Sequence, residues 1–206
     1  QWDVPFIYNE LLTGLAECAR KYHASLDGLA INTWGVDFTL FGRDGVMLGN
    51  PVHYRDKRTE GVPALTYQVI SKRELYELTG VNFNQFNTIF QLHALSLAKS
   101  PLLEVADSFL MMGDLFHYFL SGKQSCEYTN ASTTQLLDAG TGTWHEGIIA
   151  RLGLPHKIFK EITPTGTLLG AVLPAVARET GIDPDTRIIT PATHDTASAF
   201  AGAPIA

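Results

Sequence analysis

The sequence predicts an α/β fold, and three features of its first quarter support this. Residues 4–24 place apolar side chains at three- or four-residue spacing, which is typical of an amphipathic helix. The short apolar run at 29–33 is typical of an inner strand of a parallel sheet. Two further apolar runs, 38–41 and 46–48, flank Arg43-Asp44-Gly45 and predict a hairpin with Gly45 in the left-handed conformation. A helix, an inner strand and a hairpin in this order indicate an α/β domain.

The rest of the chain is mainly helical. Helical spacing predicts helices over 60–72, 73–79, 87–98, 101–120 and 144–152. The polar segment 121–134 predicts a loop, 165–173 a strand and 174–181 a short helix. A strand over 187–190 then leads to a helix of small residues after Thr196, and this helix is expected to be tightly packed. The sequence shows no repeat or linker, so one compact unit is expected.

Composition narrows the class of protein and its partners. The 206 residues are 45% hydrophobic and 17% charged, as in an ordinary globular protein. The net charge of −6 disfavours nucleic acid or an anionic membrane surface as the main partner. No apolar run is long enough for a membrane span. Cys18 and Cys126 are far apart, so the sequence predicts a reducing, cytoplasmic location without a disulfide framework.

The segment TPATHDTASAFAGA at 190–203 is the first candidate for chemistry. It places His194, Asp195 and Thr196 where a predicted strand meets a predicted helix. A helix N-terminus attracts anions, and a carboxylate there could take a proton from a hydroxyl that attacks phosphorus. The alternative is that Asp195 only caps the helix and His194 is structural, and spacing alone favours this alternative.

The segment INTWGVDF at 31–38 is the second candidate. Gly35 follows a predicted inner strand, and ligands of α/β sheets gather at the carboxyl ends of strands. Glycine lets a ligand approach the backbone, and Asp37 could accept hydrogen bonds from hydroxyls. The alternative is a turn glycine and a capping aspartate.

Two further polar segments each allow two interpretations. Arg55, Asp56 and Arg58 could hold a polar ligand, but an ion-pair network that fixes the hairpin to the next helix is favoured. Asn87 could cap a helix or face a polyol pocket, and Phe86 could be a pocket wall or core. The scattered histidines have no metal-ligand spacing, so no metal site is predicted.

Taken in order, six segments resemble the FGGY family of carbohydrate kinases over essentially the whole chain: INTWGVDF, NPVHYRDKRT, FNTIFQL, EYTNASTTQLLD, TPTGTLLG and THDTASAF. TWGVDF, YTNASTTQL and HDTAS are most similar to its rhamnulokinase branch. The resemblance implies a two-domain protein of the ribonuclease-H-like, actin-like ATPase fold, with the active site between the domains. Residues 1–206 would form the first, sugar-binding domain.

The resemblance also implies roles for site residues. Asp195 matches the general base, which removes the proton from the primary hydroxyl of a ketose as that oxygen attacks the γ-phosphorus of MgATP. L-rhamnulose would thus give L-rhamnulose 1-phosphate. His194 and Thr196 match sugar contacts beside the base, and Gly35 matches a sugar contact. Asp37 and Asn87 are added as contacts on their expected position in the pocket more than on the motif.

Departures from the family pattern set further expectations. Ala192, Thr193 and His194 replace the glycines that precede the base in other branches, which favours the rhamnulokinase branch. Nothing before Gln1 supplies the family's Asp-Gly-Ser-rich hairpin that grips the ATP phosphates, and the ATPase domain would follow Ala206. We therefore expect an incomplete first domain that is inactive alone. Its exposed sheet edge should favour aggregation. The resemblance does not identify residues of this chain that bind ATP or Mg²⁺.

Two alternatives to this function stay open. One is a kinase of the same family that acts on another ketose or deoxyketose, because the sequence does not determine the shape around Gly35 and Phe86. The other is a non-catalytic sugar-binding or scaffold module on the same fold, against which the presence of Asp195 argues.

Overall fold

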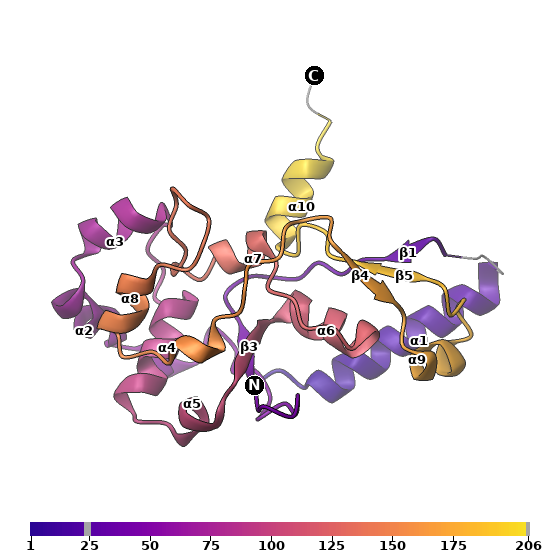
Figure 1. Cartoon of the computed structure of the whole chain (residues 1–206), viewed down its shortest axis with the longest axis horizontal. Coiled ribbons are helices and arrows are strands. Elements are labelled where there is room, and N and C mark those ends of the chain that lie inside the picture. The colour runs from indigo at the N-terminus through magenta and orange to yellow at the C-terminus, as the bar shows by residue number, and fades with distance from the viewer. Residues whose placement is uncertain (23–25, 205–206) are drawn as a thin grey trace.

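The computed structural model describes residues 1–22 and 26–204, and Figure 1 shows how its elements are arranged. The strands are β1 (Gly28–Leu29), β2 (Phe38–Phe41), β3 (Ser108–Met111), β4 (Leu168–Ala171) and β5 (Arg187–Ile189). The helices are α1 (Val4–Tyr22), α2 (Val62–Val69), α3 (Lys72–Thr79), α4 (Thr88–Leu97), α5 (Pro101–Val105), α6 (Met112–Ser121), α7 (Tyr128–Ser132), α8 (Glu146–Arg151), α9 (Pro174–Thr180) and α10 (Asp195–Gly202). Short 3₁₀ turns occur at Lys57–Thr59 and His156–Ile158.

The sheet that leads to the candidate site has the strand order β1-β5-β4. β1 pairs with β5 in parallel, as the α/β prediction requires, and β4 pairs with β5 antiparallel. The β1 ladder is shorter than the predicted strand 29–33, but the two chains stay side by side beyond it. The amide of Thr33 donates to the carbonyl of Thr193 at 2.8 Å, and Thr33 forms a parallel bridge with His194. Residues 33–35 and 193–195 therefore lie next to each other.

The second sheet pairs β2 with β3 and corrects one prediction. Residues 101–120 were expected to form one helix, but α5, β3 and α6 divide this segment. β3 is buried on both faces and pairs antiparallel with β2, from Phe38 opposite Met111 to Phe41 opposite Ser108. A strand buried on both faces lacks alternation, so its apolar run cannot be distinguished from a helix by periodicity.

The hairpin prediction is confirmed in part. Gly45 has a φ of 75°, as the loop requires. The arm 46–48 is not a strand, because only Met47 bridges to Phe41. The loop predicted over 121–134 also contains helix α7. Most other elements lie within a few residues of the predicted ranges, although the last two residues of the predicted helix 4–24 are outside the described residues.

Apolar packing holds the two sheets in place. One cluster covers β2 and β3 and includes the buried side chains of Phe109 and Ile148. Another packs α1 and α9 against β5 through Leu12, Val176 and Ile188. Because each such side chain contributes about 1.5–3 kcal/mol when fully buried, the strands that carry the site are firmly anchored.

Helix α10 differs from the rest of the chain, since it projects away from the body (Figure 1). The prediction that this helix is tightly packed is wrong, because none of its residues is buried and Phe200 is 73% exposed. Within residues 1–22 and 26–204, the helices are all too short or too polar to cross a membrane.

Candidate functional site

A pocket of about 360 Å³ lies where the extensions of β1 and β5 end. Four of the predicted site residues line it, namely Gly35, Asn87, His194 and Asp195. Its other lining residues are Trp34, Val36, Tyr54, Val81, Asn82, Asn84, Phe86 and Thr133. The pocket thus occupies the position where α/β sheets bind ligands, at the carboxyl ends of parallel strands.

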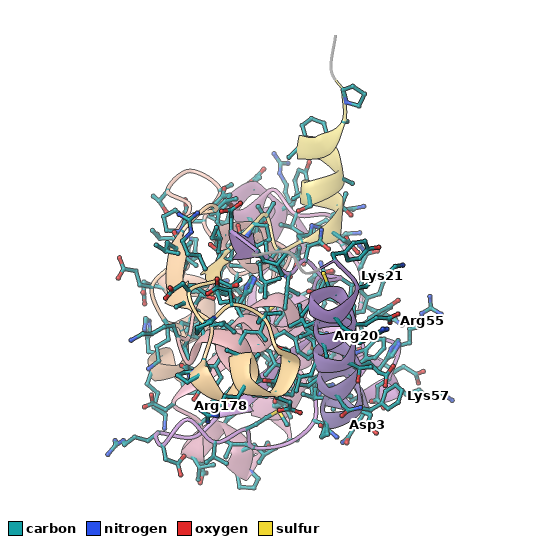
Figure 2. The ribbon with its side chains drawn as sticks, turned by 90° about the vertical axis from the view of Figure 1, so that its right-hand side faces the viewer. Asp3, Arg20, Lys21, Arg55, Lys57 and Arg178 are labelled. Atoms are coloured by element: carbon teal, nitrogen blue, oxygen red, sulfur yellow. The ribbon has the colours of Figure 1, made fainter. Side chains whose placement is uncertain are left out.

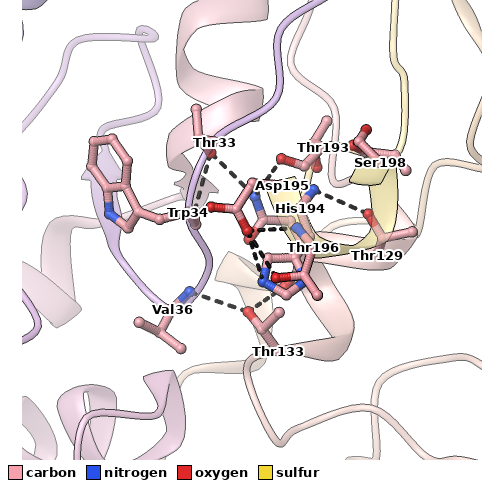
Figure 3. Close-up of polar contacts among 12 residues, drawn as sticks. Thr33, Trp34, Val36, Thr129, Thr133, Thr193, His194, Asp195, Thr196 and Ser198 are labelled. Carbon is pink, nitrogen blue, oxygen red and sulfur yellow. Dashed lines mark hydrogen bonds and ion pairs between the residues drawn. The ribbon is translucent and has the colours of Figure 1, made fainter. Parts of the chain in front are cut away.

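Asp195 is the first residue of α10, and its side chain is 55% exposed (Figure 3). Its amide donates to the carbonyl of Thr33 at 2.8 Å, which ties the helix start to the β1 extension. Its carboxylate accepts from the amide of Thr196 at 2.6 Å and from the Thr196 hydroxyl at 3.1 Å. His194 is the N-cap residue, and its Nε2 lies 3.5 Å from Asp195 Oδ1. The carboxylate therefore binds one amide of the first turn and remains open to the pocket.

Gly35 lines the pocket at the start of a tight backbone turn. A Cβ added at Gly35 would lie 2.9 Å from both Cγ2 and Oγ1 of Thr133, so a larger residue does not fit. The next residue, Val36, has a φ of 67°, and the amide of Asp37 donates to the carbonyl of Gly35 at 2.9 Å. This is a γ-turn with a β-branched residue at its centre, which is a strained arrangement.

Three hydrogen bonds hold the strained turn. The Val36 amide donates to the hydroxyl of Thr133 at 3.1 Å, as Figure 3 shows. The Val36 carbonyl accepts from the hydroxyl of Thr88 at 2.7 Å and from Nε2 of Gln91 at 3.1 Å. Strained backbone of this kind clusters at functional sites, because the surrounding structure must enforce it.

Asp37 lies beneath the pocket and does not line it. It is fully buried, and its Oδ2 accepts from the indole of Trp2 at 2.6 Å, the indole of Trp34 at 3.0 Å and the amide of Tyr54 at 3.3 Å. Gln91 donates to its other oxygen at 3.3 Å. The structure therefore places Asp37 as a support for Trp34 and Tyr54, both of which line the pocket, and not in the lining itself, where it was expected.

Asn87 and Thr196 differ in their relation to the pocket. Asn87 lines it as the N-cap residue of α4, but its side chain does not bond to the helix amides, as capping would require. Its Nδ2 instead donates at 2.9 Å to the carbonyl of Asn82 and to Oε1 of Gln135. Thr196 lies outside the lining, and its hydroxyl donates to Asp195, which lines the pocket.

An aromatic wall completes the pocket. Trp34, Tyr54 and Phe86 all line it, and the rings of Tyr54 and Phe86 lie 5.4 Å apart. Phe86 was considered as a pocket wall from the sequence, but Trp34 was not. Its position directly before the glycine at the strand end could have indicated it. Asn82, Asn84 and Thr133 were missed as site residues. Thr133 lies in the segment EYTNASTTQLLD, which was used for the resemblance but not assigned to the pocket.

The basic segment at 53–59 supports the structure. Arg58 donates to Oε1 of Gln91 and lies over the ring of Phe38 at 5.9 Å. Asp56 caps the short turn that follows it by accepting from the amide of Arg58 at 2.9 Å. Arg55 points outward at the molecular edge in Figure 2. The segment thus has the favoured structural role, but the expected ion-pair network is not formed. Among the described residues, no ion pair involves Arg55, Asp56 or Arg58, and Arg58 instead bonds the neutral amide of Gln91 on α4.

A buried carboxyl lies behind the site on α6. Asp114 accepts from the hydroxyl of Ser125 at 2.6 Å and from the amide of Glu127 at 3.1 Å. Burial raises the pKa of Asp114 to about 7, although the Ser125 hydroxyl and the Glu127 amide act to lower it. Asp114 is therefore protonated in the folded state at mildly acidic pH.

The Asp114→Asn substitution should change how stability depends on pH. Because folding raises this pKa, the contribution of Asp114 is complete below the pKa of the unfolded chain, about 4, and is lost as the pH rises through about 7. We expect the substitution to have little effect near pH 4 and to raise the free energy of unfolding above pH 7 by up to about 4 kcal/mol. Urea unfolding across this range tests it, and a difference independent of pH would contradict it.

The described side chains near the pocket do not form a metal site of their own. In the described residues, no group of three or more His, Cys, Asp or Glu side chains is placed to hold a metal ion. Asp195 and His194 alone do not form such a set. Residues 1–22 and 26–204 therefore do not provide a metal cradle of their own.

The sequence of this chain is similar to a family of known proteins. Residues 1–202 match the N-terminal domain of the FGGY family of carbohydrate kinases. The chain is 40% identical over 203 residues to a rhamnulokinase of Oceanobacillus iheyensis, covering 98% of this chain and 43% of that protein. It is 42% identical over 203 residues to a rhamnulokinase of Halalkalibacterium halodurans, with the same coverage.

The fold also resembles a solved structure. The chain superposes on a gluconate kinase from Lactobacillus acidophilus with a TM-score of 0.83 at 18% identity, covering 90% of this chain and 38% of the other. The domain thus has the ribonuclease-H-like fold of the sugar kinases, and it spans less than half the length of the relatives it matches. With a family match over nearly its whole length and relatives at 40% identity, this chain belongs to the FGGY family of carbohydrate kinases.

Proposed function

We propose that this chain is the sugar-binding N-terminal domain of a kinase that phosphorylates the primary hydroxyl of L-rhamnulose, giving L-rhamnulose 1-phosphate. The observation that carries the proposal is the carboxylate of Asp195, half exposed beside a 360 Å³ pocket that Gly35 also lines. The choice of sugar is supported by the names of the relatives, which are 40–42% identical.

The residues of this chain supply position and a base. The sugar lies in the pocket with its apolar face on the aromatic wall, while Asn82 and Asn84 offer amides to its hydroxyls. Asp195 accepts the proton of the primary hydroxyl, that oxygen forms a bond to the γ-phosphorus of ATP, and the bond from phosphorus to the β-phosphate oxygen breaks to release ADP. His194 fixes the sugar beside the carboxylate.

In this proposal, ATP and Mg²⁺ bind to parts of the protein outside these 206 residues. The matched relatives are more than twice as long as this chain. The exposed helix α10, with Phe200 at its surface, is suited to packing against a second domain. Such a domain would hold the nucleotide opposite Asp195, and the 206-residue chain alone would then be inactive.

The test is an ATP-dependent phosphorylation assay of the full-length parent protein over a panel of ketoses. We expect L-rhamnulose to give the highest kcat/KM and the 206-residue chain alone to give no turnover. A different ketose as the best substrate would replace L-rhamnulose but keep the kinase. Sugar binding without phosphorylation of any ketose would overturn the kinase assignment and favour a non-catalytic sugar-binding module.

A further inference from the structure

One buried carboxylate contacts both the loop before Asp195 and helix α7. Glu127 is fully buried, and its Oε2 accepts from the amide and hydroxyl of Thr193 at 3.0 and 2.6 Å. The same oxygen accepts from the amide and hydroxyl of Thr129 at 3.0 and 2.6 Å. Thr165 donates its hydroxyl to the other oxygen, Oε1. Both oxygens of Glu127 are therefore engaged by donors.

These bonds reach the residues next to the proposed base. The Thr129 hydroxyl, which donates to Glu127, accepts from the amide of His194 at 3.2 Å, as Figure 3 shows. The consecutive amides of Thr193 and His194 are thus bound to Glu127 directly and through Thr129. The next amide, that of Asp195, is bound to the carbonyl of Thr33. The backbone that presents the Asp195 carboxylate is held at three successive residues.

Close packing prevents this loop from shifting away. A Cβ added at Gly113 of α6 would lie 2.9 Å from Cβ of Thr193, so α6 touches the loop from behind. Thr193 is fully buried. Its position therefore depends on Glu127 on one side and on α6 on the other.

The charge of Glu127 is stabilised by neutral donors. Burial acts to raise the pKa of Glu127, but the hydroxyls of Thr129, Thr165 and Thr193 stabilise the carboxylate more, and the pKa is lowered. In the described part of the chain, no lysine, arginine or histidine forms an ion pair with it. An amide in place of the carboxylate would turn an NH₂ group toward donors and leave part of the network unpaired.

We propose that Glu127 is a positioning residue, which holds residues 193–195 so that the Asp195 carboxylate meets the sugar hydroxyl. The inference rests on the proposed function for its effect on turnover, and on the hydrogen bonds alone for its effect on the loop. A displacement of about 1 Å at a reacting group can cost on the order of 100-fold in rate. Loss of the Glu127 charge therefore affects catalysis more than sugar binding.

The experiment compares Glu127→Gln, Thr193→Val and Thr193→Ser in the full-length parent protein. Glu127→Gln and Thr193→Val should each lower kcat about 10- to 100-fold, with KM for the sugar changed by less than about threefold. Thr193→Ser keeps the donating hydroxyl and should stay within about threefold of wild type. Because the Thr193 hydroxyl acts through Glu127, the double variant E127Q/T193V should be hardly worse than Glu127→Gln alone.

Amide hydrogen exchange gives a readout that does not need kinase activity. Exchange of the Thr193 and His194 amides should be at least about tenfold faster in Glu127→Gln, and unchanged in the control Glu60→Gln, an exposed carboxylate. Unchanged exchange in folded Glu127→Gln, or an unchanged kcat, would overturn the proposal. If the wild-type parent phosphorylates no ketose, the proposed function fails, and the exchange result alone decides whether Glu127 holds the loop. If Glu127→Gln does not fold, the comparison of Thr193→Val with Thr193→Ser decides.

Discussion

Replacing Asp195 with Asn in the full-length parent protein is expected to lower kcat for the ketose by about 10²–10⁴-fold. The amide is nearly isosteric and can still accept the hydrogen bonds from Thr196, so the start of α10 should be retained. It cannot take the proton of the attacking hydroxyl. The expected signature in steady-state kinetics is therefore a loss in kcat with a small change in KM for the sugar.

Asp185→Asn is the matched control for this substitution. Asp185 is exposed and lies in the turn before β5, away from the pocket, so the same chemical change there should leave kcat unchanged. An unaltered kcat in Asp195→Asn would show that Asp195 is not the base. A large rise in KM at constant kcat would make it a binding residue only.

Asp37→Ala should produce the largest loss of stability among the site residues. Four donors converge on this buried carboxylate, from Trp2, Trp34, Tyr54 and Gln91. A buried donor that loses its acceptor costs about 1–3 kcal/mol. We therefore expect the free energy of unfolding to fall by about 3 kcal/mol or more, as measured by urea unfolding of the full-length parent.

The same substitution should weaken sugar binding, although Asp37 does not line the pocket. Trp34 and Tyr54 do line it and would lose a shared anchor. A drop in sugar affinity of about tenfold corresponds to about 1.4 kcal/mol, and titration with the ketose below the unfolding transition measures it. Stability and affinity equal to those of the Asp185→Asn control would contradict the supporting role of Asp37.

The parts of the fold that follow local rules could be predicted from the sequence. The α1 pattern, the inner strand that pairs in parallel with β5 and the helix after His194 all depend on periodicity and on strand-end signals. Strand β3 could not be predicted, because Ser108–Met111 becomes a strand by pairing with β2, about seventy residues earlier. Local propensity carries no information on such a distant partner.

The site residues also divide into those that a local signal identifies and those that depend on distant partners. Gly35, Asn87, His194 and Asp195 were identified, because they stand at strand ends or a helix start. Asp37 was expected to contact the sugar, but the sequence cannot tell that the turn directs its side chain beneath the pocket.

The turn itself shows why local rules fail at the site. A valine at a φ of 67° contradicts local preference, and bonds from the distant residues Thr133, Thr88 and Gln91 help to enforce it. Such conflicts between local preference and structure are expected at functional sites.

A crystal structure of the full-length parent with a bound ketose and a non-hydrolysable ATP analogue tests the central claim most directly. The account predicts that the sugar lies in the pocket between Gly35 and the aromatic wall, with its primary hydroxyl within hydrogen-bond distance of the Asp195 carboxylate, about 2.6–3.2 Å. A sugar bound elsewhere, or one whose primary hydroxyl points away from Asp195, would contradict it.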